Sequence, residues 1–189
     1  MSGRKTAVEG KRRARMAGGR PSVVSVRSSF PVDARTLMPP GDLHLKPGFL
    51  IRRAQQIAVS IFLDECRDFD ITPMNYAVMK VLKATPDLDQ ITLAHRAAID
   101  RSTIGGLAER LEEKGWIRRM PGTEDRRQKL LSLTEEGMRV LDSVEPAVER
   151  CQRRILGPLS PEECATFMTL LERIVDENNE ASRAPYKVG

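Results

Sequence analysis

The stretch that decides the fold runs from Asp100 to Gly137 and reads DRSTIGGLAERLEEKGWIRRMPGTEDRRQKLLSLTEEG. Its first part predicts an amphipathic helix, because apolar residues recur at helical spacing and form one stripe: Ile104, Leu107, Ala108 and Leu111. We expect the Asp100 side chain to cap this helix by accepting the backbone N–H of Thr103. Gly115 follows at the position where a left-handed residue ends many helices.

Two short strands with a basic loop between them are predicted to follow the helix. Residues 116–119 predict the first strand, and the alternating run of Leu131, Ser132 and Leu133 predicts the second. The loop between them reads GTEDRRQK. We interpret Trp116 as a core residue. This order of elements is that of a winged helix-turn-helix, so the expected fold is mainly α with a small β-wing.

The same residues resemble the MarR family of bacterial transcription regulators. The wing signature of that family, Asp-Arg-Arg and then Leu-x-Leu-Thr-x-x-Gly, appears here as Asp125, Arg126, Arg127, Leu131, Leu133, Thr134 and Gly137. The resemblance covers roughly residues 45–180, including a helix opened by Thr72 and Pro73 and a short helix over residues 90–98. It implies a DNA-binding regulator in which residues 100–103 begin the recognition helix.

The outward face of the recognition helix supplies the first set of predicted DNA contacts, namely Arg101, Ser102, Thr103, Gly105, Gly106 and Arg110. Hydroxyl groups at a helix N-terminus suit phosphate or base-edge contact. Each glycine costs about 1 kcal/mol of helix propensity. Either close approach of the backbone to the major groove or tight packing against a neighbouring helix can offset that cost. In the family these two positions often carry polar or basic side chains.

The wing supplies the second set. By resemblance, Arg126 or Arg127 enters a narrow minor groove, where the negative potential is enhanced, and Asp125 orients a neighbouring arginine. The family's common proline ahead of the wing is replaced here by Gly122 and Thr123. Residues 101–130 carry eight Lys or Arg against five acids, a local excess that favours phosphate binding.

Three regions are expected along the chain. Residues 1–43 predict a flexible basic extension, and residues 1–42 hold nine Lys or Arg against three acids. Residues 44–180 form the winged helix-turn-helix domain, with a DNA-binding core at about 72–137 and dimerisation helices at about 47–67 and 134–179. Within the last range, Ser160 and Pro161 predict a second helix start. Residues 181–189 are expected to be a tail.

The terminal helices present more apolar surface than a small wing domain can cover. The family resemblance implies that these helices interdigitate with those of a second copy, so a homodimer is the expected unit. A two-fold dimer places its recognition helices about 34 Å apart, one DNA turn. The expected partner is therefore double-stranded DNA carrying an imperfect inverted repeat.

An effector site is predicted between the first two helices and the dimerisation region. Its residues combine apolar walls with cationic groups suited to an aromatic carboxylate: Phe49, Arg52, Arg53, Gln56, Met74, Asn75 and Val78. Arg52 and Arg53 could instead meet the phosphates of an aromatic acyl-CoA thioester, since residues 47–65 are similar to family regulators of aromatic-acid catabolism. Each arginine could also pair with an acid of the partner subunit.

Other classes of protein find little support. The sequence holds no hydrolase, metalloprotease or phosphate-loop motif and no metal-ligand or cofactor motif around His44 or His95, so we expect neither an enzyme nor a cofactor. The three cysteines fit a reducing cytoplasm, and no apolar run is long enough for a membrane span. A repressor released by a ligand is favoured. A thiol-based redox sensor and an architectural DNA-binding protein without effector remain alternatives.

Overall fold

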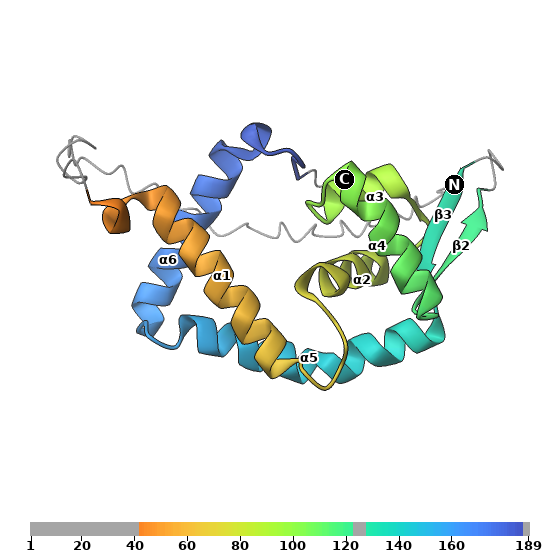
Figure 1. Ribbon diagram of the computed structural model, residues 1–189, viewed down its shortest axis with the longest axis horizontal. Coiled ribbons are helices and arrows are strands. Elements are labelled where there is room, and N and C mark those ends of the chain that lie inside the picture. Colours follow the sequence, from red (N-terminus) through yellow and green to blue (C-terminus); the bar gives the residue numbers. More distant parts are fainter. Residues whose placement is uncertain (1–41, 123–127, 187–189) are drawn as a thin grey trace, which may run out of the picture. The chain divides into compact units, whose positions relative to one another are not determined.

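The computed structural model describes residues 42–122 and 128–186 (Figure 1). Its elements in chain order are the 3-10 helix η1 (Leu43–Leu45), α1 (Pro47–Glu65), α2 (Pro73–Ala84), β1 (Leu88–Asp89), α3 (Gln90–Arg96), α4 (Arg101–Glu113), β2 (Ile117–Pro121), β3 (Lys129–Leu133), α5 (Glu135–Leu156), α6 (Pro161–Glu177) and the 3-10 helix η2 (Asn179–Ala181). Helices with one small sheet confirm the predicted fold class, mainly α with a β-wing. The expected extension at residues 1–43 lies almost entirely outside the described residues.

The sheet is antiparallel and three-stranded, with the order β1-β3-β2. Ile117 of β2 pairs with Leu133, and Leu88 of β1 pairs with Leu131, so β3 lies in the centre. Burial does not alternate along β3 as its sequence does, because Ser132 is only 4% exposed. The Ser132 hydroxyl donates to the Asp87 carboxylate and accepts the Asp87 N–H, which satisfies a polar side chain inside the core.

Helix α4 confirms the predicted stripe, since Ile104, Leu107, Ala108 and Leu111 are all buried. The predicted side-chain cap is wrong: the Asp100 carboxylate makes no capping hydrogen bond. The Asp100 carbonyl accepts the N–H groups of Thr103 at 2.9 Å and Ile104 at 3.0 Å instead, so the backbone alone satisfies these donors. Gly115 ends the helix region at a φ of +71°, as expected.

Helices α2 and α3 both begin with side-chain caps. The Thr72 hydroxyl accepts the Asn75 N–H at the start of α2, which begins at Pro73 as predicted. The Asp89 carboxylate accepts the N–H groups of Ile91 and Thr92 at the start of α3. Helix α3 is shorter than predicted because Ala98 has a φ of +51°, which no right-handed helix can include.

Helix α4, the β2–β3 hairpin and α5 meet at Thr134. Its hydroxyl donates to the Gly115 carbonyl at 2.6 Å and accepts the N–H of Gly137 at 3.0 Å, and its own N–H donates to the Trp116 carbonyl at 3.0 Å. Figure 1 shows β3 leading directly into α5. One side chain therefore ties the C-terminal end of α4 to the first turn of α5.

Polar contacts join α5 to the two helices beside it. Glu145 of α5 accepts the Tyr76 hydroxyl at 3.1 Å and pairs with Lys80 at 3.1 Å, both from α2. On the α1 side, Arg150 pairs with Glu65 at 3.0 Å. Further ion pairs join Lys83 to Asp142 and Arg154 to Asp64 and Glu65. These contacts fix α2 and the end of α1 against α5.

The first half of α1 and the whole of α6 remain poorly covered. Phe62 is the one buried residue in α1, and α6 has none. Half-exposed apolar side chains of these two helices include Leu50, Ile51, Ile57, Leu63, Phe167, Leu170, Ile174 and Val175. Helix α6 starts with the predicted cap, because Ser160 and Glu163 form a reciprocal capping box. The structure thus leaves an apolar surface that this chain alone does not bury.

Candidate nucleic-acid interface and effector groove

The polar face of α4 begins with exposed Arg101 and Ser102, followed by half-buried Thr103. Arg110 is exposed about two helical turns beyond Thr103 on the same helix. These side chains face outward because the opposite stripe of α4 is buried in the core. The arrangement presents two guanidinium groups and two hydroxyl groups on one helix, which are donors suited to phosphate and base-edge acceptors.

His95 of α3 positions one of these guanidinium groups. The Arg101 Nη2 lies 3.1 Å from His95 Nε2, and the guanidinium, which has no lone pair to offer, is the donor. His95 is half-buried, and the sequence indicated neither this contact nor its partner. The chain between the two residues turns through Ala98, whose positive φ breaks the helical spacing from which such a contact could be predicted.

Gly105 and Gly106 are half-buried on α4. A β carbon at Gly105 would meet the Gln90 Nε2 at 3.4 Å, and one at Gly106 would meet the Arg110 Nη1 at 3.5 Å. Both distances are ordinary van der Waals contacts with the ends of flexible side chains. Packing within this chain therefore does not require glycine at either position.

The wing is described up to its tip. The Gly122 N–H donates to the Gln128 carbonyl at 2.8 Å and continues the β2–β3 ladder beyond Pro121. Arg119 of β2 pairs with Glu112 at 3.1 Å, so its charge is already compensated, whereas Arg118 is exposed. The predicted minor-groove residues Asp125, Arg126 and Arg127 lie outside the described residues.

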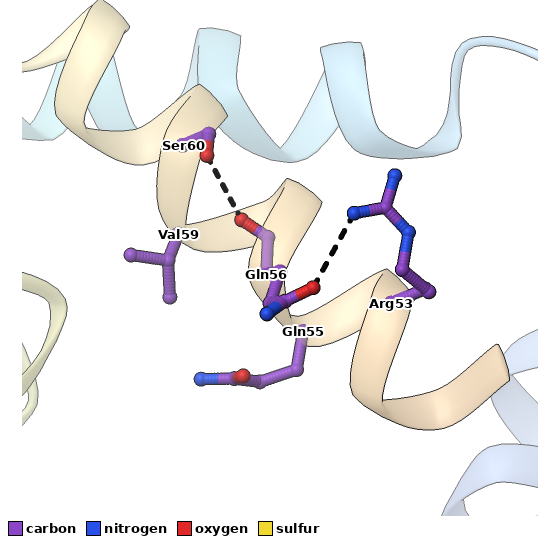
Figure 2. Close-up of a pocket in the computed structure, with 5 residues that line it drawn as sticks. All are labelled: Arg53, Gln55, Gln56, Val59 and Ser60. Atoms are coloured by element: carbon purple, nitrogen blue, oxygen red, sulfur yellow. Dashed lines mark hydrogen bonds between the residues drawn. The ribbon is translucent and has the colours of Figure 1, made fainter. Parts of the chain in front are cut away.

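A groove of about 450 Å³ lies along α1 (Figure 2) and is lined by Arg53, Gln55, Gln56, Val59 and Ser60. The Arg53 Nη1 donates to the Gln56 Oε1 at 3.3 Å, and the Ser60 hydroxyl donates to the Gln56 carbonyl at 3.0 Å. Arg53 and Gln56 were predicted from the sequence. Gln55, Val59 and Ser60 were missed, although Gln56 and Ser60 are four residues apart and so share a helix face.

The other predicted effector residues are not brought to this groove. Arg52 lies over the Phe49 ring at 5.2 Å, a cation–π contact near the start of α1. On α2, Met74 is 50% exposed and Asn75 is buried at 8%. Val78 is fully buried in the core, so its side chain packs against other core residues and is not available to a ligand.

The cysteines bear on the redox alternative. The sulfur of half-buried Cys164 lies 3.8 Å from the carbonyl oxygens of Leu156 and Leu159. Cys66 and Cys151 are each 1% exposed, and burial raises the pKa of both thiols. A raised pKa lowers the fraction of thiolate, which is the form that oxidants attack. The two buried thiols are therefore poorly suited to sensing oxidants.

The described part of the chain holds no group of three or more His, Cys, Asp or Glu side chains placed to bind a metal ion. Within residues 42–122 and 128–186, no helix combines the length and the apolar composition that crossing a bilayer requires.

The fold and the exposed polar face of α4 define the class: this is a winged helix-turn-helix protein of the kind that binds DNA. The model of the MarR family matches residues 71–129. The transcriptional regulator HosA of Escherichia coli is 32% identical over 107 residues, which span 57% of this chain and 79% of HosA. The chain belongs to the MarR family of transcription regulators.

Two longer matches agree. The transcriptional repressor NicR of Pseudomonas putida is 29% identical over 154 residues, which span 82% of this chain and 95% of NicR. The solved structure of BpsR from Bordetella bronchiseptica, described for the regulation of its DNA binding by 6-hydroxynicotinic acid, aligns with a TM-score of 0.69 at 28% identity. That alignment covers 72% of this chain and 98% of BpsR.

Proposed function

We propose that this chain is a homodimeric repressor that leaves an inverted-repeat operator when a small aromatic carboxylate binds. The observation that carries the proposal is Arg53, whose guanidinium lines the α1 groove and donates to a neutral amide, Gln56. No acid of the described residues forms an ion pair with Arg53. A carboxylate can accept two parallel N–H bonds from such a group.

The proposed dimer rests on the apolar surface that α1 and α6 leave uncovered. Ile57 and Leu63 of α1 are 48% and 47% exposed, and Ile174 of α6 is 49% exposed. Exposed apolar patches of this kind on helices mark association surfaces. A second copy packing on them would also close the α1 groove and supply apolar walls for an aromatic ring, which Val59 alone cannot provide.

In the proposed complex with DNA, α4 lies in the major groove. Arg101, Ser102 and Arg110 contact phosphates or base edges, with Thr103 beside them, and Gly105 and Gly106 let the helix backbone approach the bases. Arg126 or Arg127 of the wing reaches the minor groove, oriented by Asp125. Two such half-sites related by the dimer axis would read an inverted repeat about one DNA turn apart.

Release requires the effector to prefer a dimer whose recognition helices do not match two successive major grooves. A ligand in the α1 groove would act on α5, which contacts α1 through Arg150 and Glu65 and contacts α2 through Glu145. A coupling of about 1 to 3 kcal/mol between ligand and DNA would be typical. The relative BpsR supports an aromatic acid as the effector class, because its DNA binding is regulated by 6-hydroxynicotinic acid. An aromatic acyl-CoA is a larger alternative.

The test measures binding to a DNA sequence selected in vitro by the wild-type protein, with and without 6-hydroxynicotinate, hydroxybenzoates and their CoA thioesters. We expect one of these acids to lower DNA affinity of the wild type by about tenfold, which corresponds to about 1.4 kcal/mol. Arg53→Ala should bind DNA normally and lose this response. Arg153→Ala, which removes an exposed arginine of α5, is the matched control and should respond as the wild type does.

Two outcomes would contradict the proposal. A wild-type protein that binds its DNA equally in the presence of every acid and thioester has no effector of this class. If the acid lowers the DNA affinity of Arg53→Ala as much as that of the wild type, the carboxylate does not bind at Arg53. A response of the wild type to the CoA thioester alone would select the acyl-CoA alternative, and Arg52→Ala would then be the variant to compare.

A further inference from the structure

The chain segment after η2 returns to the start of the recognition helix. A cavity of about 370 Å³ has one wall from the α3–α4 region and the other from the C-terminal segment: His95, Ile99, Asp100, Arg101 and Ser102 face Arg183, Ala184 and Pro185. Ala184 and Pro185 are half-buried, and Arg183 is exposed. The sequence predicted only a tail here, so this juxtaposition comes from the fold alone.

The path of the segment is fixed by one amide side chain. Asn179 accepts the Tyr186 N–H at 2.8 Å through its Oδ1 and donates to the Tyr186 carbonyl at 3.1 Å through its Nδ2. Within the loop so closed, the Ala184 N–H donates to the Ser182 hydroxyl at 3.1 Å. These bonds close residues 179–186 into a loop that carries Arg183, and the shared cavity relates this loop to the start of α4.

The charged residues that line the cavity favour an anionic ligand. Arg101 and Arg183, from distant parts of the chain, line the same cavity, and neither forms an ion pair with an acid of the described residues. Arg101 donates to His95 instead, and Asp100 is the one acid among the described residues of the lining. Two cations on the wall of one cavity favour an anion there, because an anion gains charge-assisted hydrogen bonds from guanidinium groups.

We propose that Arg183 is a DNA-contacting residue, which binds the same stretch of phosphate backbone as Arg101 and Ser102. The inference rests on the proposed DNA-binding role of α4, because the start of that helix is where a phosphate would lie. Contacts to phosphates fix the register of a protein on DNA and carry no base information. The C-terminal segment is thus an additional part of the interface that adds affinity without changing sequence preference.

The test compares full-length wild type, Arg183→Ala, Arg183→Lys and Arg101→Ala by fluorescence anisotropy on a selected DNA at low and at near-physiological salt. Arg183→Ala should lower affinity several-fold at low salt and reduce the slope of log affinity against log salt by about 1 per protomer. Base preference should not change. Arg183→Lys should restore most of the slope. Arg139→Ala on α5 is the matched control and should match the wild type.

The outcomes distinguish a failure of the Arg183 contact from a failure of the proposed function. If the wild-type protein does not bind DNA, both the proposed function and the Arg183 contact are wrong. If Arg101→Ala weakens binding and Arg183→Ala binds as the wild type does, the C-terminal contact alone is wrong. Tighter binding by Arg183→Ala also overturns it, since the segment would then obstruct the helix. Should inorganic phosphate raise the melting temperature of the wild type while Arg183→Ala keeps normal DNA affinity, the cavity takes a free anion and the proposal fails.

Discussion

A β carbon at Gly137 would stand 2.0 Å from the carbonyl oxygen of Trp116. That carbonyl accepts the Thr134 N–H at 3.0 Å and cannot move without breaking the joint between the hairpin and α5. The glycine that ends the wing signature is therefore required by close backbone approach. It is a structural position beside the C-terminal end of α4, whereas the proposed DNA contacts begin at the other end of that helix.

Gly137→Ala should destabilise the protein by more than about 4 kcal/mol or prevent folding, because a clash with backbone cannot be relieved by a rotamer change. Urea unfolding followed by circular dichroism measures the effect. Gly48→Ala in α1 is the control, since nothing lies within 4 Å of its added β carbon. Its stability should be equal to or up to about 1 kcal/mol above that of the wild type. Equal stability of both variants would contradict the close approach of Gly137 to Trp116.

Gly105→Ala and Gly106→Ala should each raise stability by up to about 1 kcal/mol, since alanine is the better helix former and the added β carbon makes ordinary contacts. We expect both variants to bind DNA more weakly if α4 approaches the major groove closely. Unfolding and DNA titration on the same samples separate the two effects. If the variants are less stable than the wild type, packing requires the glycines. If their DNA affinity is unchanged, the glycines are not part of the DNA interface.

The Asp89 carboxylate should make the stability of the protein depend on pH. Burial alone would raise the pKa of its carboxyl, but hydrogen bonds from the Thr92 hydroxyl at 2.6 Å and from the N–H groups of Thr92 and Ile91 lower it overall. A folded-state pKa below the unfolded value stabilises the protein above the unfolded pKa of about 3.9. That contribution is lost as the pH falls through the folded value.

Asp89→Asn should therefore lose less stability than the wild type as the pH falls from neutral into the acid range, although it is the less stable protein at neutral pH. Urea midpoints at several pH values give the comparison. Asp42→Asn, which changes the aspartate cap of η1, is the reference for removing one carboxylate from a helix start. If the urea midpoints of wild type and Asp89→Asn fall in parallel as the pH is lowered, Asp89 does not contribute to the loss of stability in acid.

The cysteines should react in order of burial. Because burial raises the pKa of Cys66 and Cys151, both thiols should resist iodoacetamide in the native protein near neutral pH, while half-buried Cys164 reacts first. Mass spectrometry of digested samples identifies the modified residue, and denatured protein is the reference in which all three react. Rapid native modification of Cys66 or Cys151 together with loss of DNA binding would revive the redox alternative.

Local signals predicted most of the fold. The stripe of α4, the helix start at Ser160 and Pro161 and the positive φ of Gly115 depend on residues within a few positions of one another, so the sequence displays them directly. Strand β1 was missed because two residues, Leu88–Asp89, are too few to show a period. The burial of Ser132 depends on Asp87, a partner 45 positions away, which no local pattern reveals.

The candidate sites also divide into residues that local sequence indicates and residues that depend on partners far away in the chain. Arg53 and Gln56 were predicted from their residue types near the start of the first helix, where cationic and polar groups stand beside apolar ones. Arg183 was missed because the residues that line the cavity with it, such as Arg101, come from a distant segment, and the hydrogen bonds between Asn179 and Tyr186 have no local signature. Val78 was assigned to the effector site, but it belongs to the apolar stripe of α2 that the structure buries in the core.

Helix α5 is 22 residues long and is anchored at its first turn by Thr134 and Gly137. At about 1.5 Å per residue it extends about 33 Å, so a rotation of about 5° at one end displaces the other by about 3 Å. A rotation of about 5° about the C-terminal end of α5 would therefore carry its N-terminal end, and the end of α4 that Thr134 holds to it, through a distance close to the rise of about 3.4 Å between base pairs.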